Sequence, residues 1–244
     1  VPRMIYVNKM DIMGADFYNV VNMVKERLHA NGVPIQLPIG AEDTFKGIID
    51  LMNMKAEIYY DEMGNNYGEE DIPADMLEKA EEYRAALIEH VAETDEALLD
   101  KYMEGEEFTK EEISLALRKG VMNNEIVPVL CGTQNIGIQI ILNSIVAFFP
   151  SAADTVNSFV YTHEKTGEEE IAGYNVDLKP SAFVFKTIAD PFVGKISMFK
   201  VGTGVIKAGM PLYNTKKGET EKPSKLYIVK GKDLIEVDEL YAGD

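Results

Sequence analysis

Residues 4–28 read MIYVNKMDIMGADFYNVVNMVKERL, the pattern of a buried strand followed by a loop and an amphipathic helix. The apolar residues 4–7 suit a short parallel strand, and Asp16 is placed to cap a helix with apolar residues at helical spacing. The same order returns at residues 126–149, where Pro150 ends the expected helix. Two such units predict a doubly wound α/β sheet, whose ligands bind at the carboxyl ends of the strands.

The composition is that of a globular protein, with 244 residues of which 46% are apolar. No apolar run approaches the roughly 18 residues of a membrane span, so no membrane contact is expected. The single cysteine, Cys131, excludes an internal disulfide and suits a reducing compartment. His29, His90 and His163 are far apart and lack the spacing of metal ligands, so no metal site is expected.

Charge is distributed unevenly along the chain, whose net charge is -17. Residues 33–121 hold 23 acidic and 8 basic side chains, whereas residues 195–232 hold nine lysines against Glu219 and Glu221. The overall acidity argues against a nucleic-acid binder, but the distribution indicates an acidic module beside a basic one.

The rest of the chain has two further patterns. Residues 33–121 alternate between strand and helix signals, with a capping box at Thr109 and Glu112, which indicates an α+β insertion. After residue 155, short alternating segments separated by turns predict a small antiparallel β-barrel. Strands are expected at 33–40, within 47–64, and at 181–190, 194–206, 210–215 and 223–229, and helices at 77–91 and after Thr109. The predicted domains are a partial α/β sheet domain (1–32 and 122–154), the insertion (33–121) and a truncated barrel (155–244).

The loop after the first strand carries Asn8-Lys9-x-Asp11, the pattern by which many GTPases recognise guanine. The Asp11 carboxylate only accepts hydrogen bonds and matches the two donors on the Watson–Crick edge of guanine, a pair that adenine lacks. Asn8 can both donate and accept, and the stem of Lys9 can cover the ring. A chain of this length contains the pattern by chance about 3% of the time. Its position directly after a buried strand favours the functional interpretation.

The sequence resembles bacterial translation elongation factor G over essentially its whole length. The motifs that carry the resemblance are VNKMD with GADF at 7–17, QLPIGAED at 36–43, DIPADM at 71–76, NNEIVPVLCG at 123–132 and ADPFVGKISMFKV at 189–201. The resemblance implies part of a P-loop GTPase-type domain, the insertion that the family calls G′, and part of the second, β-barrel domain. It also implies that the phosphate loop, the switch segments and the catalytic histidine lie upstream, outside this chain. No catalytic residue is therefore expected here, and the fragment alone is expected to be inactive.

The resemblance also implies a guanine site on two loops, formed by Asn8, Lys9, Asp11, Thr133 and Gln134. The family's second loop begins Gly-Ser-Ala, whereas here residues 132–137 read GTQNIG, about two residues shorter. The family uses a backbone N–H of this loop to meet the guanine carbonyl, and Gln134 can supply one. The departure leaves open a diverged paralogue of the factor.

The parent protein is therefore expected to be a ribosome-dependent GTPase that hydrolyses GTP with Mg²⁺ and drives translocation of tRNA and mRNA. By family resemblance, residues 33–121 are expected to bind the C-terminal domain of the ribosomal stalk protein. The lysines of 195–232 are expected to contact small-subunit ribosomal RNA. A monomer in the bacterial cytoplasm is expected. The alternatives are a ribosome-bound GTPase of the tetracycline-protection or release-factor type, and a non-catalytic ribosome-binding module.

Overall fold

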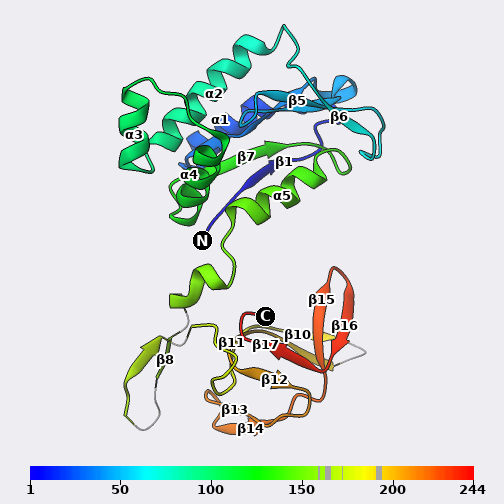
Figure 1. Ribbon diagram of the computed structural model, residues 1–244. Coiled ribbons are helices and arrows are strands. Elements are labelled where there is room, and N and C mark those ends of the chain that lie inside the picture. The colour runs from blue at the N-terminus through cyan, green and yellow to red at the C-terminus, as the bar shows by residue number, and fades with distance from the viewer. Residues whose placement is uncertain (159, 163–165, 172, 191–193) are drawn as a thin grey trace. The chain divides into compact units, whose positions relative to one another are not determined.

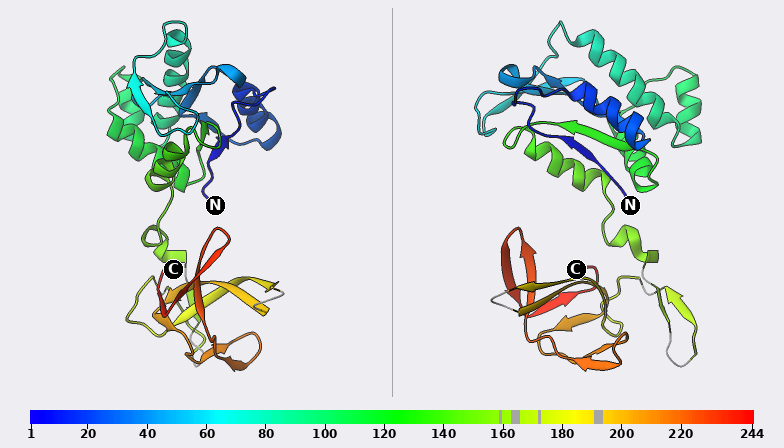
Figure 2. Two further views of the ribbon diagram at one scale, coloured as in Figure 1. Left: turned by 90° about the vertical axis from the view of Figure 1, so that its right-hand side faces the viewer. Right: turned by 180° about the vertical axis from the view of Figure 1, so that it is seen from behind.

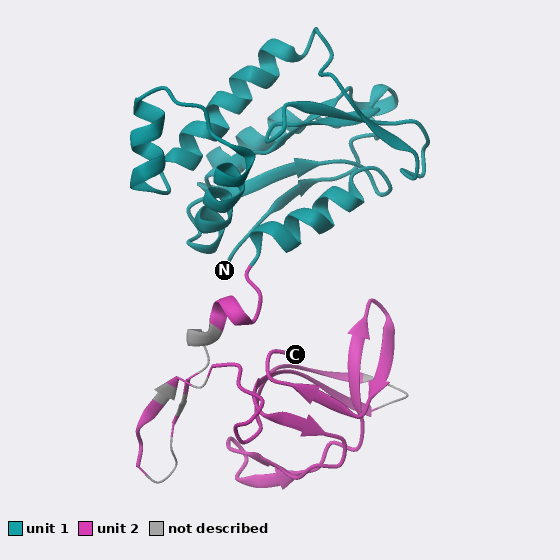
Figure 3. Ribbon diagram, in the orientation of Figure 1, with its two compact units in different colours: residues 1–149 teal, residues 150–244 magenta. Residues whose placement is uncertain are grey.

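The computed structural model describes residues 1–158, 160–162, 166–171, 173–190 and 194–244 (Figure 1). The chain divides into two compact units, residues 1–149 and residues 150–244 (Figure 3). The first unit contains the predicted insertion and the predicted α/β part as far as Phe149, and the second begins at Pro150, five residues before the predicted barrel.

The first unit is built on a parallel sheet with the strand order β1-β7-β2. Ile5 of β1 lies opposite Val129, and Val33 of β2 lies opposite Pro128. Helices α1 and α5 lie on opposite faces of this sheet (Figures 1 and 2). These elements span Ile5–Val7 (β1), Gly32–Pro34 (β2), Val127–Cys131 (β7), Phe17–Leu28 (α1) and Ile138–Phe148 (α5). The predicted α/β fold with two strand–loop–helix units is confirmed.

Helix α1 begins where the sequence predicts. The side chain of Asp16 accepts a hydrogen bond from the N–H of Asn19, which satisfies one of the free donors of the first turn. Phe17, Val21 and Val24 form its buried face. The helix ends at His29, whose positive φ of 48° breaks the helical hydrogen-bond pattern.

A second, antiparallel sheet follows β2, with the strand order β3-β4-β5-β6. Its strands span Gln36–Ile39 (β3), Gly47–Asp50 (β4), Lys55–Tyr59 (β5) and Tyr67–Glu70 (β6), and a short helix, η1, spans Glu42–Thr44. The predicted hairpin within 47–64 is the β4–β5 pair, in which Ile48 lies opposite Glu57. Strand β6 was not expected, because its YGEE sequence lacks apolar alternation.

Three helices complete the first unit: α2 (Leu77–Ala92), α3 (Glu96–Met103) and α4 (Lys110–Met122). The predicted capping box is present, since Thr109 accepts from the N–H of Glu112 and Glu112 accepts from the N–H of Thr109. Phe108 and Ile113, on either side of this cap, are both buried. Helix α3 was not predicted from periodicity.

One buried core joins the predicted α/β part and the predicted insertion. Its members come from both, for example Phe17 and Val129 from the first and Leu37, Leu87 and Leu117 from the second. Val33 and Pro34 pair with β7, so the parallel sheet continues two residues past the predicted boundary at 32. The division of residues 1–154 into two domains stays a prediction.

The second unit is rich in antiparallel β-structure. Its described strands pair as β8-β9, β10-β11, β12-β17, β13-β14 and β15-β16. They span Val160–Thr162 (β8), Glu169–Ile171 (β9), Ser181–Asp190 (β10), Gly194–Thr203 (β11), Val205–Lys207 (β12), Leu212–Asn214 (β13), Glu219–Glu221 (β14), Leu226–Lys230 (β15), Asp233–Val237 (β16) and Glu239–Tyr241 (β17), after a helix η2 (Ala153–Ser158). A small core of Val201, Ile206, Leu226 and Leu240 lies between them. The predicted antiparallel, barrel-like class is confirmed.

Helix α5 has an apolar side that is exposed in the described structure. Leu142, Ile145 and Val146 are 57%, 40% and 80% exposed, whereas Ser144 and Phe148 are buried. The window Ile138–Thr155 has a mean hydropathy of 1.3 and by length and composition is apolar enough to cross a membrane, whereas no apolar run of that length was predicted from the sequence. Helix α5 itself ends at Phe148, and Phe149 is extended. It is therefore shorter than the about 20 residues that a membrane-spanning helix needs.

Candidate functional site

The loop after β1, residues 8–15, is held by its own backbone. The N–H of Lys9, whose φ is 61°, donates to Oδ1 of Asn8 over 2.8 Å, and the N–H of Ile12 donates to the Lys9 carbonyl. The side chain of Met10 is 1% exposed and anchors the loop in the core. Asn8, Lys9 and Asp11 are all exposed. The loop thus buries one apolar residue and presents three polar side chains to solvent.

The loop after β7, residues 132–137, is organised by the hydroxyl of Thr133. Its oxygen accepts from the N–H groups of Asn135 (3.2 Å) and Ile136 (3.0 Å), and the Thr133 N–H donates to the Ile136 carbonyl. Thr133 is only 5% exposed, so its side chain shapes the loop rather than facing a ligand. Gln134 is exposed at the tip of the turn.

The two loops are joined directly at the carboxyl ends of β1 and β7. The N–H of Met10 donates to the Gly132 carbonyl over 3.1 Å, and the N–H of Gly132 donates to the Val7 carbonyl over 3.1 Å. The hydroxyl of Tyr6 donates to the carbonyls of Thr133 (3.1 Å) and Ile136 (3.0 Å). Burial, with a smaller contribution from nearby Cys131, raises the pKa of Tyr6 to about 12, which keeps it a donor.

A Cβ atom at position 132 would not fit beneath these contacts. It would lie 2.1 Å from the Tyr6 hydroxyl and 2.4 Å from the Ile136 carbonyl oxygen. Gly132 therefore permits the close approach of β1 to the second loop.

The groups left free on the two loops have a defined hydrogen-bonding character. Within the described residues, the N–H of Gln134 has no recorded acceptor, while its neighbours Thr133 and Asn135 use theirs inside the loop. The carboxylate of Asp11 has no recorded donor within the same residues. One free donor and one free carboxylate on adjoining loops match a purine with a carbonyl acceptor next to two N–H donors. Guanine has that edge.

Several residues that hold the site were not identified from sequence. Two of these residues are Tyr6 and Met10. Their partners, Thr133 and Gly132, lie more than a hundred positions away in the chain, so no local pattern indicates the contacts. Glu42 is another: its N–H donates to the Met10 carbonyl (2.8 Å), and its carboxylate accepts from the Gly14 N–H (2.6 Å). The QLPIGAED motif contains Glu42, but periodicity gives no signal of this role.

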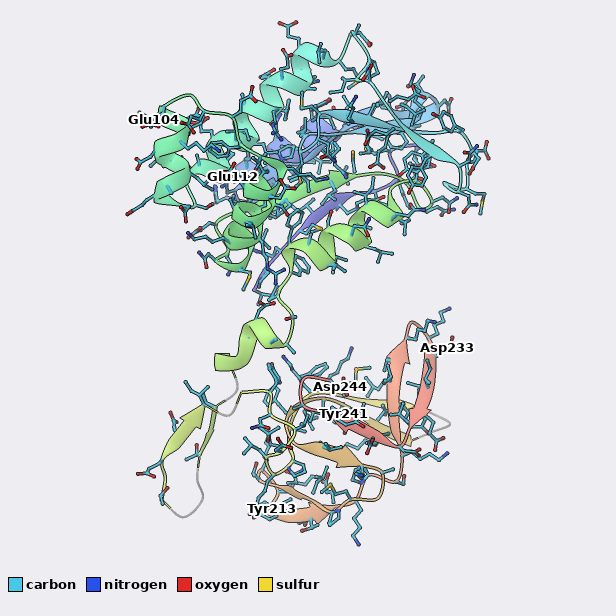
Figure 4. The ribbon with its side chains drawn as sticks, in the orientation of Figure 1. Glu104, Glu112, Tyr213, Asp233, Tyr241 and Asp244 are labelled. Carbon is cyan, nitrogen blue, oxygen red and sulfur yellow. The ribbon has the colours of Figure 1, made fainter. Side chains whose placement is uncertain are left out.

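The acidic part of the first unit presents helix α3 to solvent. Leu99, Tyr102 and Met103 are 42%, 39% and 79% exposed. Asp100 of the same helix and Glu104, which caps its end (Figure 4), are also exposed. Elsewhere in residues 33–121, three acidic side chains form ion pairs with lysines: Asp71 with Lys55, Asp95 with Lys119, and Glu112 with Lys101. The exposed face therefore combines apolar side chains with negative charge.

The lysines of 195–232 are distributed over strands, turns and loops of the second unit, with Lys216 and Lys217 in the β13–β14 turn and Lys232 in the β15–β16 turn. Three of the nine pair with glutamates: Lys207 with Glu239, Lys217 with Glu221, and Lys225 with Glu236. The ammonium of Lys200 lies over the ring of Tyr174. Within the described residues, the other five have no ion pair: Lys195, Lys216, Lys222, Lys230 and Lys232. The β13–β14 turn follows Tyr213, and the β15–β16 turn precedes Asp233 (Figure 4). The basic surface is thus smaller than the composition suggests. His163 lies outside the described residues.

Residues 179–244 match the sequence family described as elongation factor G domain 2. A crystal structure of a protein from Thermus thermophilus is similar to the whole chain, with a TM-score of 0.76 and 30% sequence identity over 100% of the chain. The match covers 33% of that protein, so the present chain spans a third of its length. The resemblance to elongation factor G that the sequence motifs indicate is confirmed.

Proposed function

We propose that this chain, whose residues 179–244 belong to the elongation factor G domain 2 family, carries the base-recognition part of a ribosome-dependent GTPase. The proposal starts from the similarity of this chain to translational GTPases, given by the match to elongation factor G domain 2 and by the similar crystal structure. The proposal adds that the intact protein hydrolyses GTP with Mg²⁺ and promotes translocation of tRNA and mRNA. The observation that carries it is that the loops bearing Asp11 and Gln134 are joined by the hydrogen bond from the Met10 N–H to the Gly132 carbonyl.

In this proposal Asp11 accepts from N1–H and the 2-amino group of guanine, and the N–H of Gln134 donates to O6. Asn8 supports the first loop, because its Oδ1 already accepts from the Lys9 N–H and its amide is left to face the base. The residues present fit the base of the nucleotide. No GxxxxGK[ST] pattern occurs in this sequence, so the proposal assigns to these residues the base of the nucleotide and not its phosphates or Mg²⁺.

Two surfaces are proposed to meet the ribosome. The exposed face of α3, with apolar side chains among carboxylates, suits the C-terminal domain of the stalk protein. The exposed lysines that have no ion pair within the described residues, among them Lys216 and Lys232 on hairpin turns, suit phosphates of small-subunit ribosomal RNA, since exposed cations can reach a nucleic-acid backbone. The protein is proposed to act as a monomer in the bacterial cytoplasm.

The function is tested with the intact protein and purified bacterial ribosomes. The proposal expects GTP hydrolysis that ribosomes stimulate, no hydrolysis of ATP, and a GTP-dependent three-nucleotide shift of the messenger on the ribosome. Stimulated hydrolysis without that shift, but with release of bound tetracycline, assigns the protein to the tetracycline-protection type instead. Ribosome binding with no nucleotide hydrolysis supports the non-catalytic module.

A further inference from the structure

The turn between β5 and β6, residues 60–66, lies against the second base-recognition loop, residues 132–137. Figure 1 shows this turn and the β7–α5 loop side by side at the same edge of the first unit. The amide of Asn135 donates to the Glu62 carbonyl over 3.1 Å, and the amide of Gln139 donates to the Gly64 carbonyl over 3.3 Å. Two side chains of the β7–α5 segment thus bind the backbone of a turn more than 70 positions away.

The approach of the two backbones depends on glycine at position 64. A Cβ atom there would lie 2.7 Å from the Asn135 carbonyl oxygen, well inside normal contact. Gly64 also has a φ of 70°, which side chains rarely adopt. Two independent features, space and backbone conformation, therefore require glycine where the turn meets the loop.

The turn is held by hydrogen bonds of its own. The carboxylate of Asp61 accepts from the N–H groups of Asn65 (3.1 Å) and Asn66 (2.6 Å), and the Gly64 N–H donates to the Asp61 carbonyl. The backbone donors, that of Asn65 first, hold the pKa of Asp61 below its ordinary value. The rings of Tyr59 and Tyr67 stack at the base of the hairpin, with centroids 5.3 Å apart.

The loop at residues 132–137 is therefore held by hydrogen bonds from two sides. Tyr6 binds the carbonyls of Thr133 and Ile136 from β1, and the turn binds Asn135 from β5 and β6. Gln134, whose N–H is free, lies between these anchored residues. The loop GTQNIG is short and has few internal contacts that could fix its backbone conformation. The direction of the Gln134 N–H therefore depends on these contacts with β1 and with the turn.

We propose that the β5–β6 turn is a positioning element for base recognition, which aims the Gln134 N–H at O6 of the guanine through the Asn135–Glu62 and Gly64–Asn135 contacts. Asn135 and Gly64 are positioning residues, since they act through Gln134. The proposal rests on the proposed guanine site. It goes further in assigning to the α+β insertion a part in nucleotide specificity.

The test measures GDP and 6-thioguanosine diphosphate affinities of the intact protein by calorimetry. Sulfur accepts hydrogen bonds weakly, so the 6-thio compound reports on the contact to position 6 alone. The variant Asn135→Asp keeps the shape of the side chain and removes its donor, and Gly64→Ala adds the obstructing Cβ. Asn53→Ala, in the β4–β5 turn, removes a similar amide contact to Asp50 that does not touch the loop.

The proposal expects Asn135→Asp and Gly64→Ala to weaken GDP binding by about 5- to 10-fold and 6-thioguanosine diphosphate binding by less, so that preference for the oxygen compound falls. Asn53→Ala should leave both affinities unchanged. Equal weakening for both ligands, or no weakening, contradicts the proposal while the guanine site stands. Failure of the unmodified protein to prefer GDP over ADP contradicts the proposed function instead. The melting temperature of each variant shows whether the variant folds. If Gly64→Ala does not fold, the affinities of Asn135→Asp alone test the proposal.

Discussion

The hydroxyl of Tyr6 donates to the carbonyl of Thr133 over 3.1 Å and so ties the first strand of the sheet to the loop after β7, 127 positions away. The same hydroxyl also donates to Ile136. A phenol shared by two carbonyls restrains both ends of a four-residue turn. The geometry of the loop at residues 132–137 therefore depends on a residue of the strand that precedes the loop at residues 8–15.

Replacing Tyr6 with phenylalanine should loosen this loop and destabilise the first unit. The Thr133 carbonyl loses its donor, while the Ile136 carbonyl keeps the Thr133 N–H, and the loss costs roughly 1–3 kcal/mol of unfolding free energy. The raised pKa of Tyr6 means that its contribution is present below the ordinary value of 10.0 and is lost as pH rises toward about 12. Urea unfolding at neutral pH and absorbance titration of tyrosinate measure the two effects.

Tyr213→Phe is the matched control, because Tyr213 is 60% exposed. It should leave the free energy of unfolding unchanged. If Tyr6→Phe unfolds at the same urea concentration as Tyr213→Phe, the hydroxyl does not hold the loop.

Glu112 should make the stability of the first unit depend on pH, with stability lost at low pH. The Nζ of Lys101 lies 2.8 Å from its Oε1, and this contact, with the Thr109 N–H second, holds the pKa of Glu112 below its ordinary value of 4.5. A lowered carboxyl pKa contributes stability above pH 4.5 that is lost as pH falls through the lowered value. Glu112→Gln should therefore melt at a lower temperature than the unmodified chain at neutral pH, with the difference shrinking under acid.

Glu111→Gln changes the same charge in the same first turn of α4, where Glu111 is exposed. It controls for the helix dipole and should show little of this pH-dependent difference. Identical melting curves for Glu112→Gln and Glu111→Gln at every pH would contradict a stabilising contact between Glu112 and Lys101. Thr109→Ala removes the other half of the cap and should cost about 1 kcal/mol.

Binding of the stalk protein's C-terminal domain should weaken as salt rises. Exposed charges are screened beyond about 8 Å at physiological ionic strength, and residues 33–121 hold 23 acidic side chains against 8 basic ones. Asp100→Lys with Glu104→Lys, both beside the exposed apolar side chains of α3, should lower the affinity and flatten the salt dependence. Surface plasmon resonance at several salt concentrations measures both.

Glu26→Lys adds the same kind of charge change on α1, outside the acidic residues 33–121. It should leave stalk binding nearly unchanged. Binding that ignores salt, or that responds equally to Glu26→Lys, would exclude α3 as the docking surface.

The 244-residue chain by itself should bind GDP weakly. Base contacts alone are present in it, whereas most of the charge of a nucleotide lies in its phosphates, for which the sequence contains no glycine-rich loop. Calorimetry should give a dissociation constant well above the order of 1 μM. A constant below that value would show that these residues suffice for the nucleotide.

Features encoded within a few residues were predictable from the sequence. Asp16 caps α1 and Thr109 with Glu112 caps α4, each through contacts three positions apart. Parallel pairing of β1 with β7 followed from two strand–loop–helix units. The loop that contains Asn8 was located by the same local pattern, because Asn8 follows strand β1 directly. Its role in guanine binding stays a prediction.

What the sequence did not reveal depends on contacts between distant residues. The Tyr6–Thr133 and Gly64–Asn135 contacts join elements that are far apart in the chain, and no spacing rule reports them. Thr133 was predicted to contact the base, but the structure shows its hydroxyl bound within its own loop. The ion pairs of Lys207 with Glu239 and of Lys225 with Glu236 likewise became visible only in the fold.

The central claim, that Asp11 reads guanine, is tested most directly by Asp11→Asn in the intact protein. Guanine offers two donors to the carboxylate, whereas xanthine keeps N1–H and presents a carbonyl in place of the amino group. An asparagine amide, with one acceptor and one donor, complements xanthine and mismatches guanine, at roughly 1–3 kcal/mol for each unpaired group. The measurement compares GTP and XTP affinities, and ribosome-stimulated hydrolysis of each, in the unmodified and Asp11→Asn proteins. The account predicts weaker GTP binding and stronger XTP binding in Asp11→Asn; unchanged GTP affinity with no gain for XTP would contradict it.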